Sequence, residues 1–258
     1  MEKEYYTTRL STGLALHEEM KLILSLWKKG MKNQDIIKSC LETGAFSNIT
    51  STRLRNMLSG CFTPRFLENE NNAINSQLLI KALSSAELSL VFFIYTVRAN
   101  FILRDFLKVV YWNRYASGYE FINVDEAKSF IDQGLQEGRM KKSWSESTIK
   151  KNSSYLISCL IDYGLLEVEN RTERRLTPPR LADNVAVYLA YELHFSGLGD
   201  NAVINHPDWQ LFGLMPEDVR GELKALAVNR HWIIQAAGEV VQISWAYANM
   251  EEVIDVIS

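Results

Sequence analysis

One stretch, from Gly138 to Arg180, constrains the fold of this chain more than any other. It reads GRMKKSWSESTIKKNSSYLISCLIDYGLLEVENRTERRLTPPR: a basic segment, a helical pattern, a glycine and two short strand patterns. Ser143 or Ser145 can cap the helix, because either hydroxyl can accept a hydrogen bond from a free amide of the first turn. Ser143 also has Glu146 three residues later, as in a capping box. Gly164 is typical of the left-handed residue that ends a helix.

The helix between these ends is amphipathic. Its apolar stripe contains Ile149, Leu156, Leu160 and Tyr163, and its other positions are mostly Ser, Thr, Asn and Lys. Such a helix docks by one side and leaves the other free. Residues 165–169 and 174–177 then form a predicted hairpin that turns at 170–173. A capped helix followed by a hairpin predicts a winged helix-turn-helix, a module that usually binds duplex DNA.

The charge distribution favours the same function. Residues 139–180 contain nine Lys or Arg and five Asp or Glu, a net charge of +4. The whole chain carries −3, which leaves −7 for the rest. A basic island on an acidic protein points to a localised contact with a polyanion. The alternative is an ordinary solvated helix face beside a charged surface hairpin.

The predicted DNA-binding residues come from the loop before the helix, the polar helix face and the hairpin. They are Lys141, Lys142, Ser147, Thr148, Lys150, Lys151, Asn152, Ser154, Arg171, Arg174 and Arg175. The loop at 137–144 is longer than the usual turn of three or four residues, so its lysines join the predicted surface. Lysine discriminates bases less well than arginine, so we expect weak sequence specificity. Asn152 can read adenine, and a structural role is an equal alternative.

The preceding part of the chain, residues 1–118, is predicted to be a helical domain. Helical patterns cover 16–29, 33–43, 50–58, 75–83, 86–97 and 100–112, and a break follows at 113–119. Arg53, Arg55 and Arg65 are candidates for secondary DNA contacts at phosphates, because no acidic residue occurs between 43 and 67. Three arginines on a short helix are also common on an ordinary protein surface.

The domain with the hairpin is predicted to span residues 119–182. It includes a supporting helix at 123–136, which begins with the capping pattern Asn123-x-x-Glu126. A small acidic α+β domain is predicted to span 183–258. Residues 181–258 contain three basic and eleven acidic side chains, net −8. Helices are predicted at 183–195, 216–228 and 250–257. A second hairpin is predicted from 231–236 and 239–245, turning at Ala237-Gly238. Because this acidity repels DNA, we expect a protein partner or a packing role for the domain.

No cofactor, metal site or catalytic group is predicted, and we expect a protein that is not an enzyme. Cys40, Cys61 and Cys159 lie far apart within apolar helical patterns, as buried reduced thiols do in a cytoplasmic protein. The four histidines have no ligand-like spacing, and no Gly-rich phosphate loop or nucleophile elbow occurs.

We expect no membrane association. Residues 1–10 are charged and polar, unlike a signal peptide. The most apolar run, LSLVFFIYTV at 88–97, is about half as long as the roughly 20 residues that span a bilayer.

Four segments together resemble the BrxA family of bacteriophage-exclusion (BREX) defence systems. They are YTTRLSTGLAL at 6–16, residues 33–46, SESTIKKNSSYLISCLIDYGLL at 145–166 and ISWAYANMEEVI at 243–254. The resemblance implies a small, non-enzymatic DNA-binding component of a multi-gene phage-defence system, with other BREX proteins as partners of the acidic domain. It supplies no residue-level DNA code.

Two other functions remain open at this point. The protein can be an interaction adaptor in which the winged helix is only a scaffold and the acidic domain docks onto a defence partner. It can also bind RNA through its basic, helical N-terminal half, although exposed stacking aromatics of the usual kind are not evident there.

Overall fold

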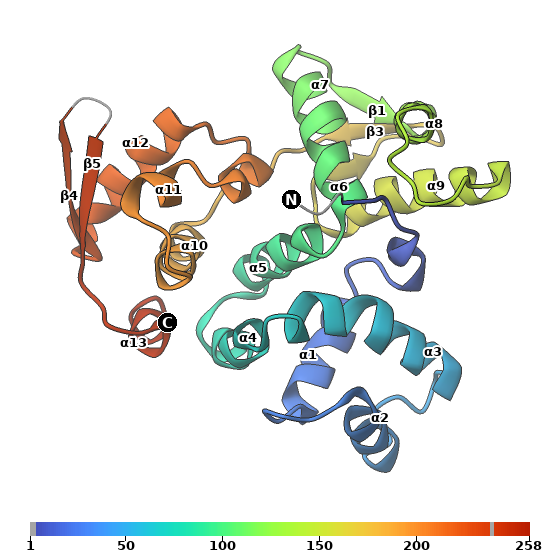
Figure 1. Ribbon diagram of the computed structural model, residues 1–258, viewed down its shortest axis with the longest axis horizontal. Coiled ribbons are helices and arrows are strands. Elements are labelled where there is room, and N and C mark those ends of the chain that lie inside the picture. Colours follow the sequence, from blue (N-terminus) through green and yellow to red (C-terminus); the bar gives the residue numbers. More distant parts are fainter. Residues whose placement is uncertain (1–3, 238–239) are drawn as a thin grey trace. The chain divides into compact units, whose positions relative to one another are not determined.

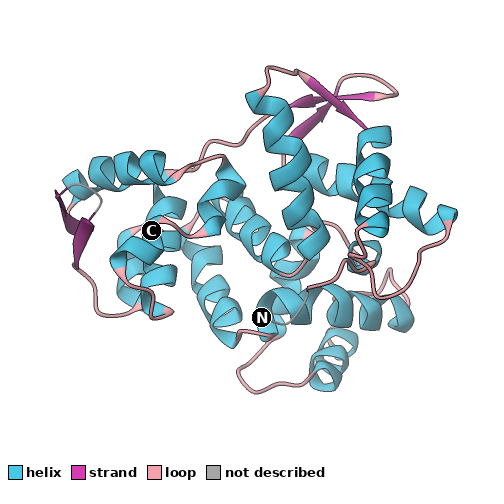
Figure 2. Ribbon diagram, turned by 45° about the horizontal axis from the view of Figure 1, so that its top comes forward, coloured by secondary structure: helices cyan, strands magenta, loops and turns pink. Residues whose placement is uncertain are grey.

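The computed structural model of the chain describes residues 4–237 and 240–258. Most of these residues are helical, and the strands form two small antiparallel sheets (Figures 1 and 2). This confirms the prediction of a mainly helical protein with small β hairpins.

The chain forms two compact units, and each contains two separate segments. Unit 1 comprises residues 1–74 and 92–179, and unit 2 comprises 75–91 and 180–258. Helices α4 (Glu70–Ala82) and α5 (Ser85–Arg98) contribute residues to both units. The predicted division into three domains, 1–118, 119–182 and 183–258, is a separate description of the chain and remains a prediction.

Unit 1 is built from helices and one three-stranded sheet. Its helices are α1 (His17–Leu26), α2 (Asn33–Glu42), α3 (Ser51–Met57), α6 (Phe101–Phe106), α7 (Trp112–Ala116), α8 (Val124–Gln136) and α9 (Glu146–Asp162). Short 3-10 and π-helical segments cover Arg9–Thr12, Leu58–Leu67 and Leu107–Tyr111. Its strands are β1 (Phe121–Asn123), β2 (Leu166–Val168) and β3 (Glu173–Leu176), in the order β1-β3-β2.

An aromatic cluster forms the core of unit 1. The Phe66 ring lies edge-on to Phe92 at 5.3 Å and to Tyr95 at 5.7 Å. Tyr163, at the end of α9, shares a hydrogen bond of 2.7 Å with Thr96. The α9 helix is therefore anchored at its C-terminal end in this core, while Gly164 (φ 75°) ends it in the left-handed conformation that its sequence predicts.

Three features of unit 1 differ from the sequence predictions. The helix predicted to stop at residue 58 continues as the π-helical segment to Leu67, with Pro64 inside it. The helix predicted at 100–112 extends through a π-helical turn to Ala116. Strand β1 was not predicted, because three residues without turn signals on both sides resemble any loop. It pairs with β3, from Phe121 opposite Arg175 to Asn123 opposite Glu173.

Unit 2 packs its own helices and a hairpin around aromatic side chains. Its elements are α10 (Asp183–Phe195), α11 (Asp200–Ile204), a 3-10 turn (Pro207–Phe212), α12 (Pro216–Leu226), a second 3-10 turn (Ala227–Asn229), β4 (Trp232–Ala237), β5 (Val240–Trp245) and α13 (Met250–Val256). The Tyr191 ring on α10 contacts Trp232 at 5.8 Å and Trp245 at 4.8 Å. The predicted hairpin is confirmed as β4 paired with β5. Gly238 of its predicted turn and Glu239 of its predicted second strand lie outside the described residues.

Within the described part of the chain, no single helix has the length and apolarity needed to cross a bilayer. Only α5 combined with the helical stretch Phe101–Ala116 meets the requirement, as a pair bent by 107°.

Candidate nucleic-acid interface

Strand β1, helices α8 and α9, and strands β2 and β3 form the frame of the candidate interface (Figure 1). Asn123 caps α8 as predicted, because its side chain accepts a hydrogen bond from the Glu126 amide at 3.1 Å while Glu126 accepts one from the Asn123 amide at 2.9 Å. Helix α8 packs against α9, and β3 lies between β1 and β2. This arrangement fixes α9 from one side.

Helix α9 begins with a serine cap. The Ser145 hydroxyl accepts a hydrogen bond from the Thr148 amide at 3.3 Å, so Ser145 and not Ser143 is the capping residue. The buried face of α9 contains Ile149, Asn152, Ser153, Leu156, Ile157, Cys159 and Leu160. The predicted amphipathic helix is therefore present, with its apolar side against the unit.

The exposed face of α9 is polar and basic. Ser147, Lys150, Lys151 and Ser154 are all exposed. At about 100° per residue they fall within one arc of the helix surface. In residues 4–237 and 240–258 no ion pair involves Lys150 or Lys151. Both ammonium groups are thus available to an anion in solution.

Two predicted contact residues on α9 have internal roles. Asn152 is only 3% exposed and donates a hydrogen bond to the Thr148 carbonyl at 2.8 Å. Its assignment to the DNA-contacting surface is therefore wrong, because a buried amide cannot reach a base edge. Thr148 is half-buried, and its hydroxyl lies 2.9 Å from the Ser145 hydroxyl within the cap.

The β2–β3 hairpin is shaped by Asn170 at its turn. The Asn170 side-chain oxygen accepts hydrogen bonds from the amides of Thr172 at 2.9 Å and Glu173 at 3.0 Å. This side-chain turn leaves Arg171 exposed at the tip. Like the α9 lysines, Arg171 has no ion pair with the residues that the structure describes.

The other two hairpin arginines are held within the hairpin. Arg174 donates to the carbonyls of Asn170 at 2.8 Å and Glu173 at 2.9 Å. Arg175 donates twice to Glu169, at 2.9 and 3.1 Å, and lies over the Phe121 ring at 5.0 Å. Both are half-buried, so the hairpin presents less free positive charge than its sequence predicts.

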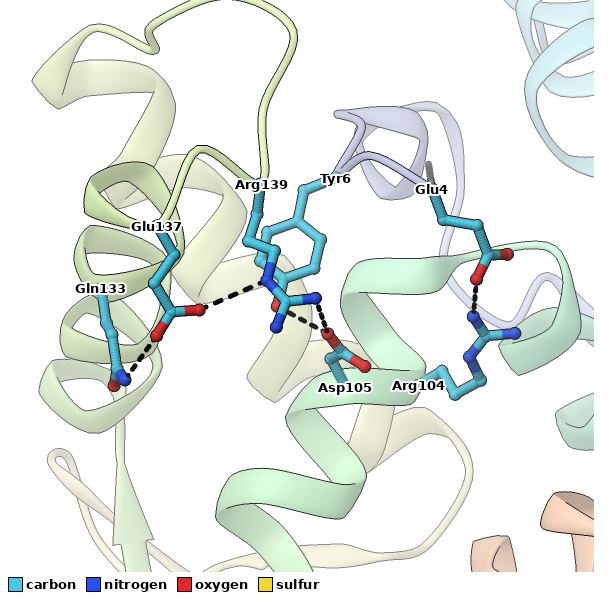
Figure 3. A network of polar contacts seen from close by, with 7 residues as sticks. All are labelled: Glu4, Tyr6, Arg104, Asp105, Gln133, Glu137 and Arg139. Carbon is cyan, nitrogen blue, oxygen red and sulfur yellow. Dashed lines mark hydrogen bonds and ion pairs between the residues drawn. The ribbon is translucent and has the colours of Figure 1, made fainter. Parts of the chain in front are cut away.

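The basic loop, residues 137–144, is held at its start by the N-terminal segment (Figure 3). The Tyr6 amide donates to the Arg139 carbonyl at 2.8 Å. The Arg139 guanidinium lies 3.3 Å from Glu137 and 3.8 Å from Asp105. Arg139 is therefore a structural residue, and the exposed positive charges of the loop are Lys141 and Lys142.

Lys141 has one aromatic neighbour, since its ammonium lies 5.3 Å from the centre of the Tyr5 ring. The cation–π attraction at such a distance is weak when exposed to water, about 0.5–1 kcal/mol. It orients the side chain without neutralising its charge.

The three secondary candidates separate into two groups. Arg53 and Arg55 are exposed on α3. Arg65 is 2% exposed, and its guanidinium donates to the carbonyls of Gly13, Leu14 and Ala15. The prediction of a phosphate contact at Arg65 is wrong, because this side chain is buried and occupied by backbone oxygens.

Sequence reasoning missed Tyr6 and Asp105, which position the basic loop. The Tyr6 hydroxyl donates to Asp105 at 2.9 Å, and burial raises the pKa of Tyr6 above its usual range, with the Asp105 hydrogen bond adding to the effect. The sequence did contain one sign of this contact, which is a glycine at position 134 inside helix α8. A side chain there has no room, because a methyl group at Gly134 would lie 2.6 Å from the Tyr6 ring.

Among residues 4–237 and 240–258, no cluster of three or more His, Cys, Asp or Glu side chains is able to hold a metal. Burial raises the pKa of the Cys40 thiol to about 11 and that of Cys159 to about 12, so both stay protonated at neutral pH.

Comparison with known families identifies the chain. The BrxA family model matches residues 4–192, which include the basic loop, α9 and the β2–β3 hairpin. The chain belongs to the BrxA family. Family membership confirms the resemblance found in the sequence and makes this a BREX-associated protein. The family match ends within α10, and residues 193–258 lie outside it.

A solved structure shares the fold. The chain is similar to the crystal structure of an uncharacterized protein from Magnetospirillum magneticum, with a TM-score of 0.57 and 17% sequence identity over 74% of this chain and 94% of that chain. At this identity the similarity concerns the fold alone. No curated protein matches this sequence.

Proposed function

We propose that this BrxA-family protein binds double-stranded DNA, without catalysis, through a winged helix-turn-helix formed by β1, α8, α9, β2 and β3. In this proposal α9 is the recognition helix and the β2–β3 hairpin is the wing. The order β1-β3-β2 and the packing of α8 on α9 support this interpretation. The biological setting is the defence system to which the family belongs.

The observation that carries the proposal is the exposed face of α9. Lys150 and Lys151 lie there with Ser147 and Ser154, and this face has small polar side chains that allow close approach of a phosphate backbone. Its only acidic neighbour in the first turn is Glu146. Opposite charge and a slender polar helix are what a DNA groove accommodates.

The flanking contacts come from the basic loop and the wing tip. Lys141 and Lys142 of the loop and Arg171 of the wing are exposed. We assign Arg174 and Arg175 a supporting role, because their donors are already engaged within the hairpin. In this proposal most contacts are made to the phosphate backbone of the DNA, so the protein binds DNA with little sequence specificity.

The test is direct binding of labelled duplexes to the full chain. At low salt, a random-sequence DNA duplex should bind, and an unrelated sequence of the same length should bind with similar affinity. An RNA duplex of equal length serves as the competitor. No binding of DNA at low salt contradicts the proposal, and stronger competition by RNA than by DNA would assign the interface to RNA.

A second candidate function is docking onto a protein partner through unit 2. Residues 181–258 carry net −8, and two apolar side chains are strongly exposed there, Val228 at 82% and Ile233 at 66%. Co-purification with other components of the defence system that survives nuclease treatment would support this function. Loss of co-purification on nuclease treatment would reject it in favour of bridging by DNA.

A further inference from the structure

Helix α3 has an exposed face of polar and cationic side chains. Thr50 caps the helix, accepting a hydrogen bond from the Arg53 amide at 3.2 Å. Leu54, Met57 and Leu58 are buried. The exposed positions are Ser51, Thr52, Arg53, Arg55, Asn56 and Ser59. Every exposed side chain from 51 to 59 is therefore small and polar or cationic.

The two arginines lie on either side of the middle of this face. At about 100° per residue, positions around the exposed arc follow a fixed order. That order is Ser51, Arg55, Thr52, Asn56, Arg53. A cation on each side of the short polar side chains Thr52 and Asn56 matches a duplex groove, which has a phosphate strand on each side and base edges at its floor.

Charge around α3 favours an anionic partner. Residues 43–67 contain no Asp or Glu. The acids of the adjacent helix α2 are engaged: Asp35 accepts from the Lys32 amide at 3.0 Å, and Glu42 lies 3.8 Å from Lys38. Among residues 4–237 and 240–258, neither Arg53 nor Arg55 has a carboxylate within ion-pair distance.

The helices packed beside α3 resemble those that position a DNA-contacting helix. Helix α2 lies against both α1 and α3, so α3 is the third member of a three-helix arrangement. In Figure 1, α3 and α9 both begin at the right-hand side of unit 1.

We propose that the exposed face of α3 is a second binding surface for the same DNA duplex, with Arg53 and Arg55 at phosphates and Thr52 and Asn56 facing the groove. The inference rests on the proposed function of α9 and adds a longer, two-part footprint. Arg65 has no part in it, because it is buried beneath the N-terminal segment.

The experiment compares the full chain with an Arg53→Ala/Arg55→Ala variant. Each phosphate contact contributes about 0.9 to the slope of log K against log salt concentration. The double variant should therefore lose about 2 from the slope, and a hydroxyl-radical footprint should lose one of its two protected stretches. An Arg53→Lys/Arg55→Lys variant should keep most of the slope, because lysine keeps the charge.

A matched control removes two exposed lysines elsewhere, in the variant Lys108→Ala/Lys224→Ala. Its slope should remain within the experimental scatter of the unmodified protein. An Arg53→Ala/Arg55→Ala variant that unfolds like the unmodified protein and keeps both slope and footprint overturns the second surface while leaving the α9 interface intact. Absence of DNA binding by the unmodified protein instead contradicts the proposed function itself.

Discussion

The phenol of Tyr6 donates a hydrogen bond of 2.9 Å to the carboxylate of Asp105, which lies 99 residues later in the chain (Figure 3). Asp105 also faces the Arg139 guanidinium at 3.8 Å. The N-terminal segment, helix α6 and the start of the basic loop thus meet at one carboxylate. The position of Lys141 and Lys142 depends on this contact, because they follow Arg139 by only two and three residues.

Gly134 permits this contact, and its replacement by alanine should lower stability. The added methyl would lie 2.6 Å from the Tyr6 ring. Overpacking typically costs about 1–3 kcal/mol, against about 1 kcal/mol gained from helix propensity. Gly221→Ala on α12 is the matched control, since nothing lies within 4 Å of its added methyl. Denaturant unfolding should show a lower free energy of unfolding for Gly134→Ala and a higher one for Gly221→Ala. Equal gains would refute the close approach.

Arg65 should matter for stability and not for DNA. Its three carbonyl partners lie at 3.1, 3.1 and 2.6 Å, and replacement by methionine removes all three guanidinium hydrogen bonds. We expect a loss of about 2 kcal/mol or more in the free energy of unfolding, since hydrogen bonds from a charged group contribute about 1.5–3 kcal/mol. Lys108→Met provides the exposed comparison. A changed salt slope in a folded Arg65→Met protein would restore Arg65 to the DNA-binding surface.

The two kinds of wing arginine should separate experimentally. Arg175→Ala removes a surface ion pair to Glu169 and should lower the free energy of unfolding by up to about 1 kcal/mol. Arg171→Ala should leave stability within about 0.5 kcal/mol and lower the slope of log K against log salt by about 0.9. Unfolding curves and DNA titrations of both variants test this. The assignment fails if Arg171→Ala unfolds more easily and binds DNA unchanged.

Unit 2 should lose stability on acidification through His194. Burial lowers the pKa of His194, whose ring stacks on Trp245 at 4.3 Å. Asp200 opposes the effect, raising the pKa by a smaller amount. A lowered folded-state pKa means that the unfolded chain binds the proton more readily. The contribution of the neutral, buried His194 ring to the free energy of unfolding is therefore fully present above about pH 6.5, and it is lost as the pH falls below that value.

The measurement is the free energy of unfolding followed by tryptophan fluorescence between about pH 7 and about pH 5. His194→Phe keeps an aromatic ring on Trp245 and should show a weaker dependence on pH than the unmodified protein. Identical pH dependence in the two proteins would remove His194 as the cause.

Local signals predicted the elements around the interface well. Each of these signals acts within a few residues, so the local sequence is enough to predict the element. The signals are the Asn123–Glu126 capping pattern of α8, the apolar stripe of α9 and the glycine at 164 that ends α9. The 165–177 hairpin was found for the same reason. Its turn at Asn170 is made by that residue's own side chain.

Long-range contacts explain what the sequence did not predict. The predicted roles of Asn152 and Arg65 were based on the polarity of their side chains, and both side chains are buried. The burial of Arg65 involves a segment distant in the chain, because its guanidinium donates to the carbonyls of residues 13–15. The hairpin charges were overestimated because Arg174 and Arg175 find acceptors only when the strands pair. Strand β1 forms because it pairs with the edge of β3, which lies more than 45 residues later in the chain. The three residues of β1 alone contain no sign of this pairing.

The salt dependence of DNA binding tests the central claim most directly. The affinity of a labelled duplex is measured at several salt concentrations for the full chain and for Lys150→Ala/Lys151→Ala, with Lys108→Ala/Lys224→Ala as the control of equal charge. We predict a steep slope for the unmodified protein and the control, and a slope lower by about 0.9 per lysine for the α9 variant, with unchanged unfolding. An α9 variant that binds with the slope and affinity of the control would contradict the assignment of α9 as the DNA-binding helix.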